Sequence, residues 1–317
     1  MGRIVTFGEA LGMLRAREVG SLAHLSELAI GTAGAEANVA IGVARLGGSA
    51  TWLGRVGSDG LGRRVVRELR AEGIDVRAII DDSAPTGLLL KESPTAGRTV
   101  VSYYRAGSAG SRLAPDDLAE LDLTTDDILH VTGITPALSS TARAATDRAI
   151  DMAHAVGATV SFDVNHRSRL WASSDEAGEV YRGIAARAHT VFAGEDEAAL
   201  VAPAADPRDP AALAHAVAAW GPREVVIKRG AAGALALVDG RIVEQAAIAV
   251  NVVDTVGAGD AFVAGYLVET LAGLAVEDRL ATAVRCGAAA CQHPGDWEGL
   301  PTRADLAANL GSDPVTR

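Results

Sequence analysis

The sequence predicts an α/β protein whose core is a mostly parallel β-sheet covered by helices on both faces. Short apolar runs typical of buried strands alternate along most of the chain with segments of helical hydrophobic period. Glycines follow several of the helical segments, as is typical of helix ends. The chain has 317 residues, of which 49% are hydrophobic, so it is long enough to bury a large core.

The expected elements follow one another as strand and helix. The first strand covers 4–8, and the first helix covers 35–46 and ends at Gly47. Further strands are expected at 51–56, 128–131, 159–164, 191–193 and 224–228, with a hairpin over 234–243. Further helices are expected at 61–72, 139–156, 175–188 and 210–219, and another from Gly259 to about 271. This alternation favours parallel strands that are joined by crossover helices.

Two segments, 11–33 and 84–110, interrupt this alternation because neither shows a helical period. Within the second, 86–91 and 99–105 alternate between apolar and polar residues like the two strands of a hairpin. We expect the two segments to form a small β-structured lid. No linker rich in Pro, Gly or Ser divides the chain, so the lid is expected within a single domain over 1–317.

The composition argues against some classes of binding partner. A formal net charge of −11 argues against a nucleic-acid or anionic-membrane surface, which needs clustered Lys and Arg. No apolar run approaches transmembrane length, and the first residues are typical of a strand rather than of a signal peptide. Cys286 and Cys291 lack a metal-binding or redox spacing and are expected to be thiols in a reducing compartment. We expect a cytoplasmic protein that binds small molecules.

The segment 254–262, DTVGAGDAF, indicates phosphate chemistry. Gly257, Ala258 and Gly259 lead into a helix, and the free N–H groups at a helix N-terminus can hold an anion. Asp260 lies in the first turn, where its carboxylate could take a proton from a hydroxyl group. The structural alternative stays open, because an Asp at this position also stabilises the helix dipole by roughly 0.3–1 kcal/mol. An anion site beside a base is what phosphoryl transfer to an alcohol requires.

Two motifs resemble a known family. DTVGAGD at 254–260 resembles the C-terminal signature of the ribokinase-like (PfkB) carbohydrate kinases, and GAEANVA at 34–40 with GRVGSDGLG at 54–62 resembles their N-terminal block. The resemblance implies a ribokinase-like three-layer sandwich with a mostly parallel central sheet and a small β-structured lid. It also implies an ATP-dependent kinase that acts on a carbohydrate hydroxyl and uses Mg²⁺ and, in many members, a monovalent cation such as K⁺.

The same resemblance assigns roles around the transferring phosphate. Gly257, Ala258 and Gly259 would form the anion hole through their backbone N–H groups, and Asp260 would be the catalytic base. Asp254 matches the position that helps to hold the monovalent cation in many members.

On the ATP side, Glu197 resembles the acidic end of a motif that organises Mg²⁺ through water, with Gly194 in place of the usual Asn. An exposed helix carboxylate is the structural alternative for Glu197, and an ordinary turn is the alternative for 228–233. The residues expected on ATP are Asn165, Lys228, Gly230, Gly233, Gly257 and Gly259.

Two arginines favour an acidic acceptor, although a surface arginine on an edge strand is the structural alternative for Arg105. Arg105 ends a lid strand, and Arg167 follows the strand over 159–164, at an edge where α/β sheets place ligands. A guanidinium group pairs with a carboxylate through two hydrogen bonds. Within the family, YYR at 103–105, TGITPAL at 132–138, DVNHR at 163–167 and GDWEG at 295–299 resemble the 2-keto-3-deoxygluconate kinases, which phosphorylate the terminal hydroxyl of a keto acid. That resemblance places these residues on the sugar acid: Gly34, Asn38, Tyr103, Arg105, Ile134, Arg167 and Asp296.

Two positions depart from this resemblance. Leu89 and His166 stand where close members carry Tyr. Losing a phenol hydrogen bond, worth roughly 0.5–1.5 kcal/mol, leaves open which epimer or acid is preferred. The alternatives are another sugar kinase of the family, of ribokinase or fructokinase type, and a non-catalytic sugar-binding regulator on the same fold. Exposed strand edges in the lid favour a homo-oligomer that forms through it.

Overall fold

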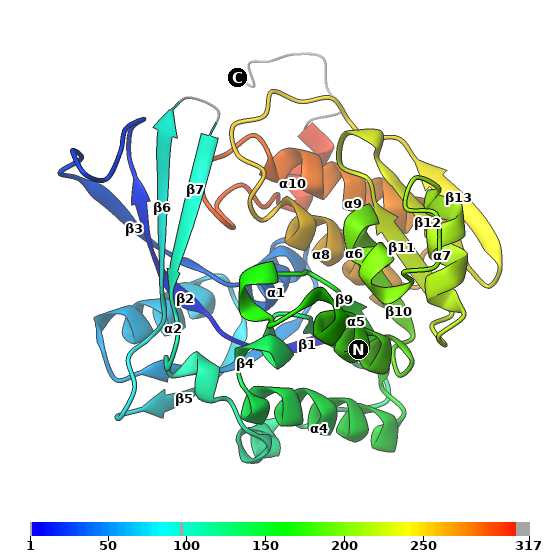
Figure 1. Ribbon diagram of the computed structural model, residues 1–317, viewed down its shortest axis with the longest axis horizontal. Coiled ribbons are helices and arrows are strands. Elements are labelled where there is room, and N and C mark those ends of the chain that lie inside the picture. Colours follow the sequence, from blue (N-terminus) through cyan, green and yellow to red (C-terminus); the bar gives the residue numbers. More distant parts are fainter. Residues whose placement is uncertain (1, 96–97, 309–317) are drawn as a thin grey trace.

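The structure is a computed structural model that describes residues 2–95 and 98–308, and a nine-stranded β-sheet forms its centre (Figure 1). The strands lie in the order β13-β12-β11-β10-β9-β8-β1-β4-β5. Neighbours from β11 to β5 pair in parallel, and β12 and β13 add an antiparallel hairpin at one edge. Their bounds are β1 Ile4–Phe7, β4 Ala50–Gly57, β5 Asp75–Asp81, β8 Ile128–Thr132, β9 Thr159–Asp163, β10 Thr190–Gly194, β11 Glu224–Lys228, β12 Ala234–Val238 and β13 Arg241–Gln245.

The central strands are apolar along their whole length because both faces of the sheet are covered. Successive side chains of a strand point to opposite faces. Trp52 therefore packs into one hydrophobic cluster and Leu53 into the other, and Val226 and Val225 divide in the same way. Burial on both faces explains the continuous apolar runs in the sequence.

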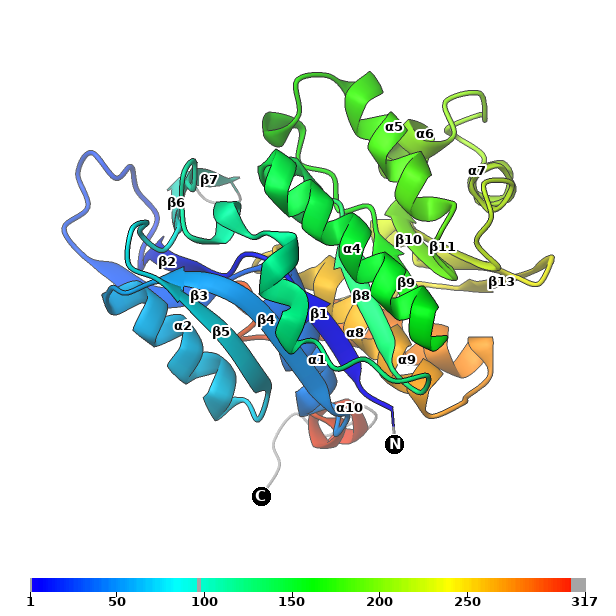
Figure 2. The ribbon, with the colours of Figure 1, turned by 90° about the horizontal axis from the view of Figure 1, so that it is seen from below.

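Helices form the two outer layers of a three-layer sandwich (Figure 2). The helices on one face are α1 Ala35–Arg45, α2 Gly60–Ala71, α8 Ala258–Leu271, α9 Val276–Ala290 and α10 Arg303–Ala308. Those on the other face are α4 Ser140–Val156, α5 Ser174–Ala185, α6 Glu195–Val201 and α7 Pro210–Ala218. Shorter turns complete the connections at α3 Thr135–Leu138 and at the 3₁₀ segments Gly110–Arg112, Pro115–Glu120, Ser168–Leu170 and Gly230–Ala232.

A second sheet of four strands stands beside the main sheet, on the left of Figure 1. Its order is β3-β2-β6-β7, with β2 and β6 parallel in the middle and an antiparallel partner on either side. The bounds are β2 Leu11–Ala16, β3 Leu28–Ala33, β6 Leu88–Thr95 and β7 Arg98–Tyr104. All four strands come from the two segments in which the sequence predicted a lid, whose residues 96–97 lie outside the described residues. We call it the small sheet.

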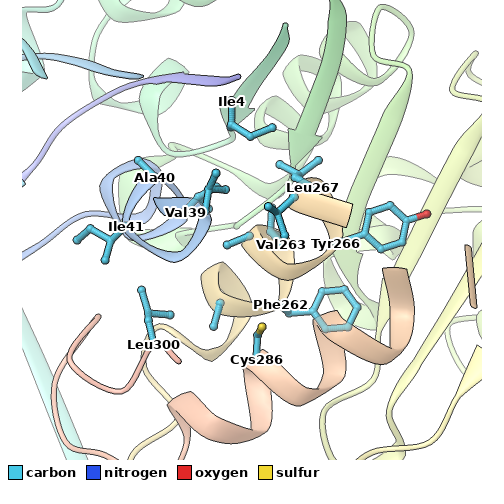
Figure 3. Packing of buried hydrophobic residues seen from close by; sticks show 14 of the residues in the cluster. Ile4, Val39, Ala40, Ile41, Phe262, Val263, Tyr266, Leu267, Cys286 and Leu300 are labelled. Atoms are coloured by element: carbon cyan, nitrogen blue, oxygen red, sulfur yellow. The ribbon is translucent and has the colours of Figure 1, made fainter. Parts of the chain in front are cut away.

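Packing between α1, α8 and β1 fixes the position of both helix N-termini. In Figure 3, Val39 and Ala40 of α1 lie in one cluster with Val263 and Leu267 of α8 and with Ile4 of β1. All five side chains are buried. The first turns of the two helices are therefore held at the same end of the sandwich.

Some short elements differ from the expectation. Strand β5 and helices α6, α9 and α10 were not among the expected elements; β5 is an edge strand of mixed character, and α6 and α10 have only seven and six residues. The helix expected over 175–188 ends at Ala185. The alanines at 186 and 188 favour a helix, so the sequence predicted a longer one, but the chain must turn after Ala185 to enter β10. Within the described part of the chain, no helix has the length and apolar character needed to span a membrane.

Candidate active site

The glycine loop, residues 254–257, leads into α8 beside the carboxyl ends of the parallel strands. Gly257 is the N-cap and has a φ of 78°, and a Cβ at this position would lie 1.8 Å from the backbone oxygen of Asp296. Only glycine fits both the conformation and the space. Gly257 has no side chain to cap the helix, so the N–H groups of Gly259 and Asp260 remain available to an anion.

Asp260 is buried in the first turn of α8 and is held by two amides. Asn38 of α1 donates to one carboxylate oxygen at 2.8 Å, and Asn165 donates to the other at 3.2 Å. Burial raises the pKa of Asp260 to about 7; the Asn38 hydrogen bond opposes the rise, and the charges of Asp163 and Asp296 add to it. A carboxylate whose pKa lies near neutrality is well matched to taking a proton from a hydroxyl group.

A cavity of about 620 Å³, here called the larger cavity, lies on one side of α8, within the size range of ligand sites. Its walls are mostly apolar and include Phe262, Val284 and Ala288. Of the residues that the sequence predicted on ATP, this cavity contains Lys228, Gly230, Gly233 and Gly259. Such walls suit a flat base and a ribose.

Lys228 connects this cavity to the ends of neighbouring strands. Its ammonium group donates to both carboxylate oxygens of Asp163, at 2.7 and 2.9 Å. Burial would lower the pKa of Lys228, but the charges of Asp163 and Glu197 outweigh it and leave the pKa raised. The lysine therefore stays charged at the point where phosphates would meet the sheet.

Glu197 caps the start of α6. Its two carboxylate oxygens accept hydrogen bonds from the backbone N–H groups of Gly194, at 2.7 Å, and His166, at 2.8 Å. Although burial by itself would raise it, the pKa of Glu197 is lowered by the charge of Lys228 and by these N–H groups. The carboxylate is ionised and beside Lys228, which fits an outer-sphere role toward Mg²⁺, a cation that keeps much of its water.

A second, smaller cavity lies between the small sheet and the glycine loop. All seven residues predicted to face the sugar acid line it. Gly257 and Asp260 line it as well, whereas Ala258 and Gly259 line the larger cavity. The first turn of α8 therefore separates the two cavities.

Buried acceptors without a partner surround Asp260. Within the described residues, the side-chain oxygens Oδ1 of Asn38, Asn165 and Asp296 accept no hydrogen bond. Leaving such atoms unpaired is unfavourable unless a ligand or water satisfies them. Three acceptors beside a base suit a ligand with several hydroxyl donors, which is the chemistry of a sugar.

The two arginines of the smaller cavity have different surroundings. Arg105 is half-buried, donates from Nε to Glu9 at 2.6 Å and stacks over the Tyr103 ring at 5.4 Å. Arg167 is exposed and donates to the backbone oxygen of His166 at 3.2 Å. The sequence predicted both arginines at this cavity but did not predict the pairing of Arg105 with Glu9.

Asn165 has an unusual backbone. Its φ of 38° is one of two positive values among the described non-glycine residues. That region is costly for most residues and tolerable for Asn. It directs the side-chain amide between Asp260 and Asp163, at 3.2 and 3.5 Å. His166, which stands in place of a tyrosine, meets the hydroxyl of Tyr181 at 2.9 Å.

Sequence reasoning missed two buried glutamates in the smaller cavity. Glu9 follows β1 and binds Arg105 and the hydroxyl of Ser108. Glu36 lies in the first turn of α1 and accepts from the hydroxyls of Thr132 and Thr135, at 2.6 and 2.7 Å. Their position next to the carboxyl ends of parallel strands was the available signal.

Asp254, predicted to hold a monovalent cation, already has a cationic partner. The ammonium group of Lys91, from the small sheet, binds the Oδ2 oxygen of Asp254. The same ammonium group donates to the backbone oxygen of Gly295 at 3.2 Å. These contacts do not fit an additional cation at the Asp254 carboxylate, because the charge of that cation would lie beside the like charge of the Lys91 ammonium group.

Comparison with known proteins agrees with this geometry. Residues 1–303 match the model of the pfkB family carbohydrate kinases. The chain belongs to this family. It is therefore an ATP-dependent carbohydrate kinase on a ribokinase-like fold, as the two motifs predicted.

Three relatives illustrate the similarity. A 2-dehydro-3-deoxygluconokinase from Bacillus subtilis is 38% identical, over 97% of this chain and 95% of its own length. A 2-dehydro-3-deoxygalactonokinase from Haloferax volcanii is also 38% identical, over 88% of this chain and 87% of its own. The crystal structure of a fructokinase double mutant from Vibrio cholerae, with fructose, ADP and potassium bound, is 29% identical and has a TM-score of 0.85, over 98% of this chain and 99% of its own.

Proposed function

We propose that this kinase phosphorylates the terminal hydroxyl of 2-keto-3-deoxygluconate, with MgATP as the donor. The position of Asp260 carries the proposal. It lines the smaller cavity together with Arg105 and Arg167, at the turn of α8 that borders the larger cavity. An acid whose carboxylate meets the arginines has its far hydroxyl beside Asp260. The names of the relatives from Bacillus subtilis and Haloferax volcanii support the same class of substrate.

Asp260 acts as the base for the acceptor hydroxyl. With a pKa of about 7, a large share of this group is ionised at neutral pH and can take the proton. The hydroxyl oxygen bonds to the γ-phosphorus while the bond from that phosphorus to the bridging oxygen breaks. ADP then leaves, and the proton of the hydroxyl stays on Asp260. The amides of Asn38 and Asn165 hold the carboxylate in place.

The donor lies along the larger cavity, with its phosphates at the N-terminus of α8. The backbone of Gly257, Ala258 and Gly259 shapes the anion hole there, the N–H groups of Gly259 and Asp260 are its available donors, and Lys228 adds a positive charge. Gly230 and Gly233 border the nucleotide. Mg²⁺, when bound, neutralises charge on the phosphates, and Glu197 would hold it through water.

The arginines account for the choice of an acid. Arg105 is positioned by Glu9 and Tyr103, so little of its rotational freedom remains to be lost on binding. Arg167 is exposed and can turn to a second carboxylate oxygen. A neutral sugar would offer neither arginine a carboxylate; Arg105 would keep its pairing with Glu9, and Arg167 would keep its hydrogen bond to the backbone oxygen of His166. The orphaned acceptors of Asn38 and Asp296 take the hydroxyls of the sugar chain.

A substrate panel tests this proposal. ADP release is measured with 2-keto-3-deoxygluconate, its galactonate epimer, fructose and ribose, at equal concentrations. We expect the two keto acids to give a kcat/KM at least tenfold above either neutral sugar. A preference for fructose or ribose would contradict the proposal and favour a fructokinase or ribokinase type. The absence of a phenol at Leu89 bears instead on which epimer or acid is preferred.

We also expect a homo-oligomer that forms through the small sheet. Its edge strands are β3 and β7, where Ile30 and Tyr104 are 52% and 64% exposed. Unpaired edges with apolar side chains are usually covered. A monomer in light scattering at micromolar concentration would contradict this. Since its substrates are an intracellular nucleotide and a metabolite, we expect the enzyme in the cytoplasm.

A further inference from the structure

The lysines of this chain are few and lie at special places. Of the 29 basic residues counted as Lys or Arg, 27 are arginines and only Lys91 and Lys228 are lysines. Both pair with a carboxylate at the active site, Lys228 with Asp163 and Lys91 with Asp254. An ammonium group is a compact point charge, whereas a guanidinium group is a broad plane. These two positions therefore hold the kind of cation that most resembles a monovalent ion.

Lys91 reaches the glycine loop from the small sheet. In β6 the buried side chains alternate, so Leu89 and Lys91 both point to the inner face of the sheet. Lys91 is only 3% exposed and Asp254 only 9%. A buried ammonium group requires a counter-charge and hydrogen-bond acceptors, and it has both in Asp254 and in the backbone oxygen of Gly295.

The contacts of Lys91 join the glycine loop to the segment that packs against it. Asp254 also accepts from the N–H groups of Val256 at 3.2 Å and Gly295 at 3.4 Å. The residue after Gly295 is Asp296, whose backbone oxygen packs directly against Gly257. Lys91 therefore bridges the start of the glycine loop and the segment that holds its last residue in place.

These are the tasks that a monovalent cation at Asp254 would perform: neutralising the carboxylate, binding a backbone oxygen and adding positive charge beside the anion hole. We propose that Lys91 takes the place of that cation, so that this chain turns over without K⁺. Lys91 then acts as a positioning residue, through the glycine loop. The proposal rests on the proposed function in one respect only: the kinetic test uses 2-keto-3-deoxygluconate as the acceptor.

The kinetic test compares chloride salts of K⁺ and choline at equal ionic strength, with 2-keto-3-deoxygluconate and MgATP. For the wild-type enzyme we expect kcat to differ by less than about twofold between the two salts. For Lys91→Met we expect kcat in choline to fall at least tenfold and to recover in a saturable way with K⁺. Arg98→Met, which removes an exposed charge from the neighbouring strand β7, is the matched control and should behave like wild type in both salts.

A binding test uses no acceptor. We follow the thermal unfolding of both proteins during titration with K⁺ or choline. Since a ligand that binds only the folded state raises Tm, Lys91→Met should show a saturable rise with K⁺ alone, and wild type should show none. This readout stays valid if the kinetic test fails because the acceptor is a different sugar.

Several outcomes would overturn the proposal. Activation of the wild-type enzyme more than about fivefold by K⁺ is one, and it needs no variant, so it decides the matter even if Lys91→Met does not fold. Full turnover of Lys91→Met in choline is another. A third is a loss of turnover in Lys91→Met that K⁺ does not reverse, together with no rise in Tm when K⁺ is added. Lys91 would then only stabilise the structure of the glycine loop.

Discussion

The larger and smaller cavities meet at the first turn of α8 but are built from different groups. The larger cavity offers apolar side chains and backbone, and the glycines Gly230, Gly233 and Gly259 lie along it. The smaller cavity offers charged and polar side chains, most of them paired: Arg105 with Glu9, and Asn38 with Asp260. We therefore expect donor binding to depend mainly on backbone shape and acceptor binding to depend on particular side chains.

This difference has a consequence for substitution. Changing one of the apolar side chains in the larger cavity alters mainly its volume, whereas changing Lys228 there, or a paired side chain in the smaller cavity, leaves a buried partner without its counterpart. The second kind of change is the more costly, because an unpaired buried polar or charged group loses its hydration without compensation. Specificity for the acceptor is thus expected to change with few substitutions, and affinity for ATP with many.

The largest expected effect is at the boundary between the cavities. Asp260→Asn should lower kcat by roughly 10²–10⁴-fold, because the amide cannot take the proton of the hydroxyl. The KM for ATP should change little. The measurement is steady-state ADP release with both substrates varied.

A matched control separates the two interpretations of Asp260. Asp278 lies exposed in the first turn of α9 and lines neither of the two cavities, so Asp278→Asn removes only a helix-start carboxylate. If Asp260 served only the helix dipole, the two variants would show similar small losses of stability and nearly normal turnover. Near-normal kcat in Asp260→Asn would refute its role as base.

A smaller effect is expected on the acceptor side alone. Arg105→Met leaves Glu9 buried without its cation, so the informative variant is the double change Glu9→Gln and Arg105→Met. Losing hydrogen bonds to a charged group costs roughly 1.5–3 kcal/mol, which predicts a rise of about 10- to 100-fold in KM for the keto acid. The KM for ATP should stay within about twofold. An equal rise for a neutral sugar would contradict recognition of a carboxylate.

The mildest test changes only the pH. Because the pKa of Asp260 is raised to about 7 and the ionised form is active, kcat/KM should fall about tenfold per unit below pH 7 and level off above it. The Asn38 amide stabilises the anion, so Asn38→Ala should shift this acid limb to higher pH. If kcat/KM instead fell only near the ordinary pKa of an exposed carboxyl group, the buried Asp260 would not be the group that sets the pH dependence.

Local patterns predicted much of the fold and of the site. The alternation of strand and helix predicted the mostly parallel sheet, and glycines at 257 and 259 predicted a helix-start anion site. These features depend on neighbouring residues, through side-chain alternation, helical period and the freedom of glycine. Two elements escaped prediction for local reasons: β5 is an edge strand that mixes buried and exposed residues without a clear alternation, and α6 has only seven residues, which is too few to show a helical period.

The sequence by itself therefore determined the fold class, the glycine loop and the seven residues expected on the sugar acid, all of which line the smaller cavity. Only the tertiary structure decided how the charges pair. Arg105 and Glu9 are 96 positions apart, and Lys91 and Asp254 are 163 apart. No local sequence pattern predicts such a pair. The two partners meet only because the fold brings their strands and loops together at the edge of the sheet. The same pairing places a lysine of the small sheet on the carboxylate that the sequence had predicted for a monovalent cation.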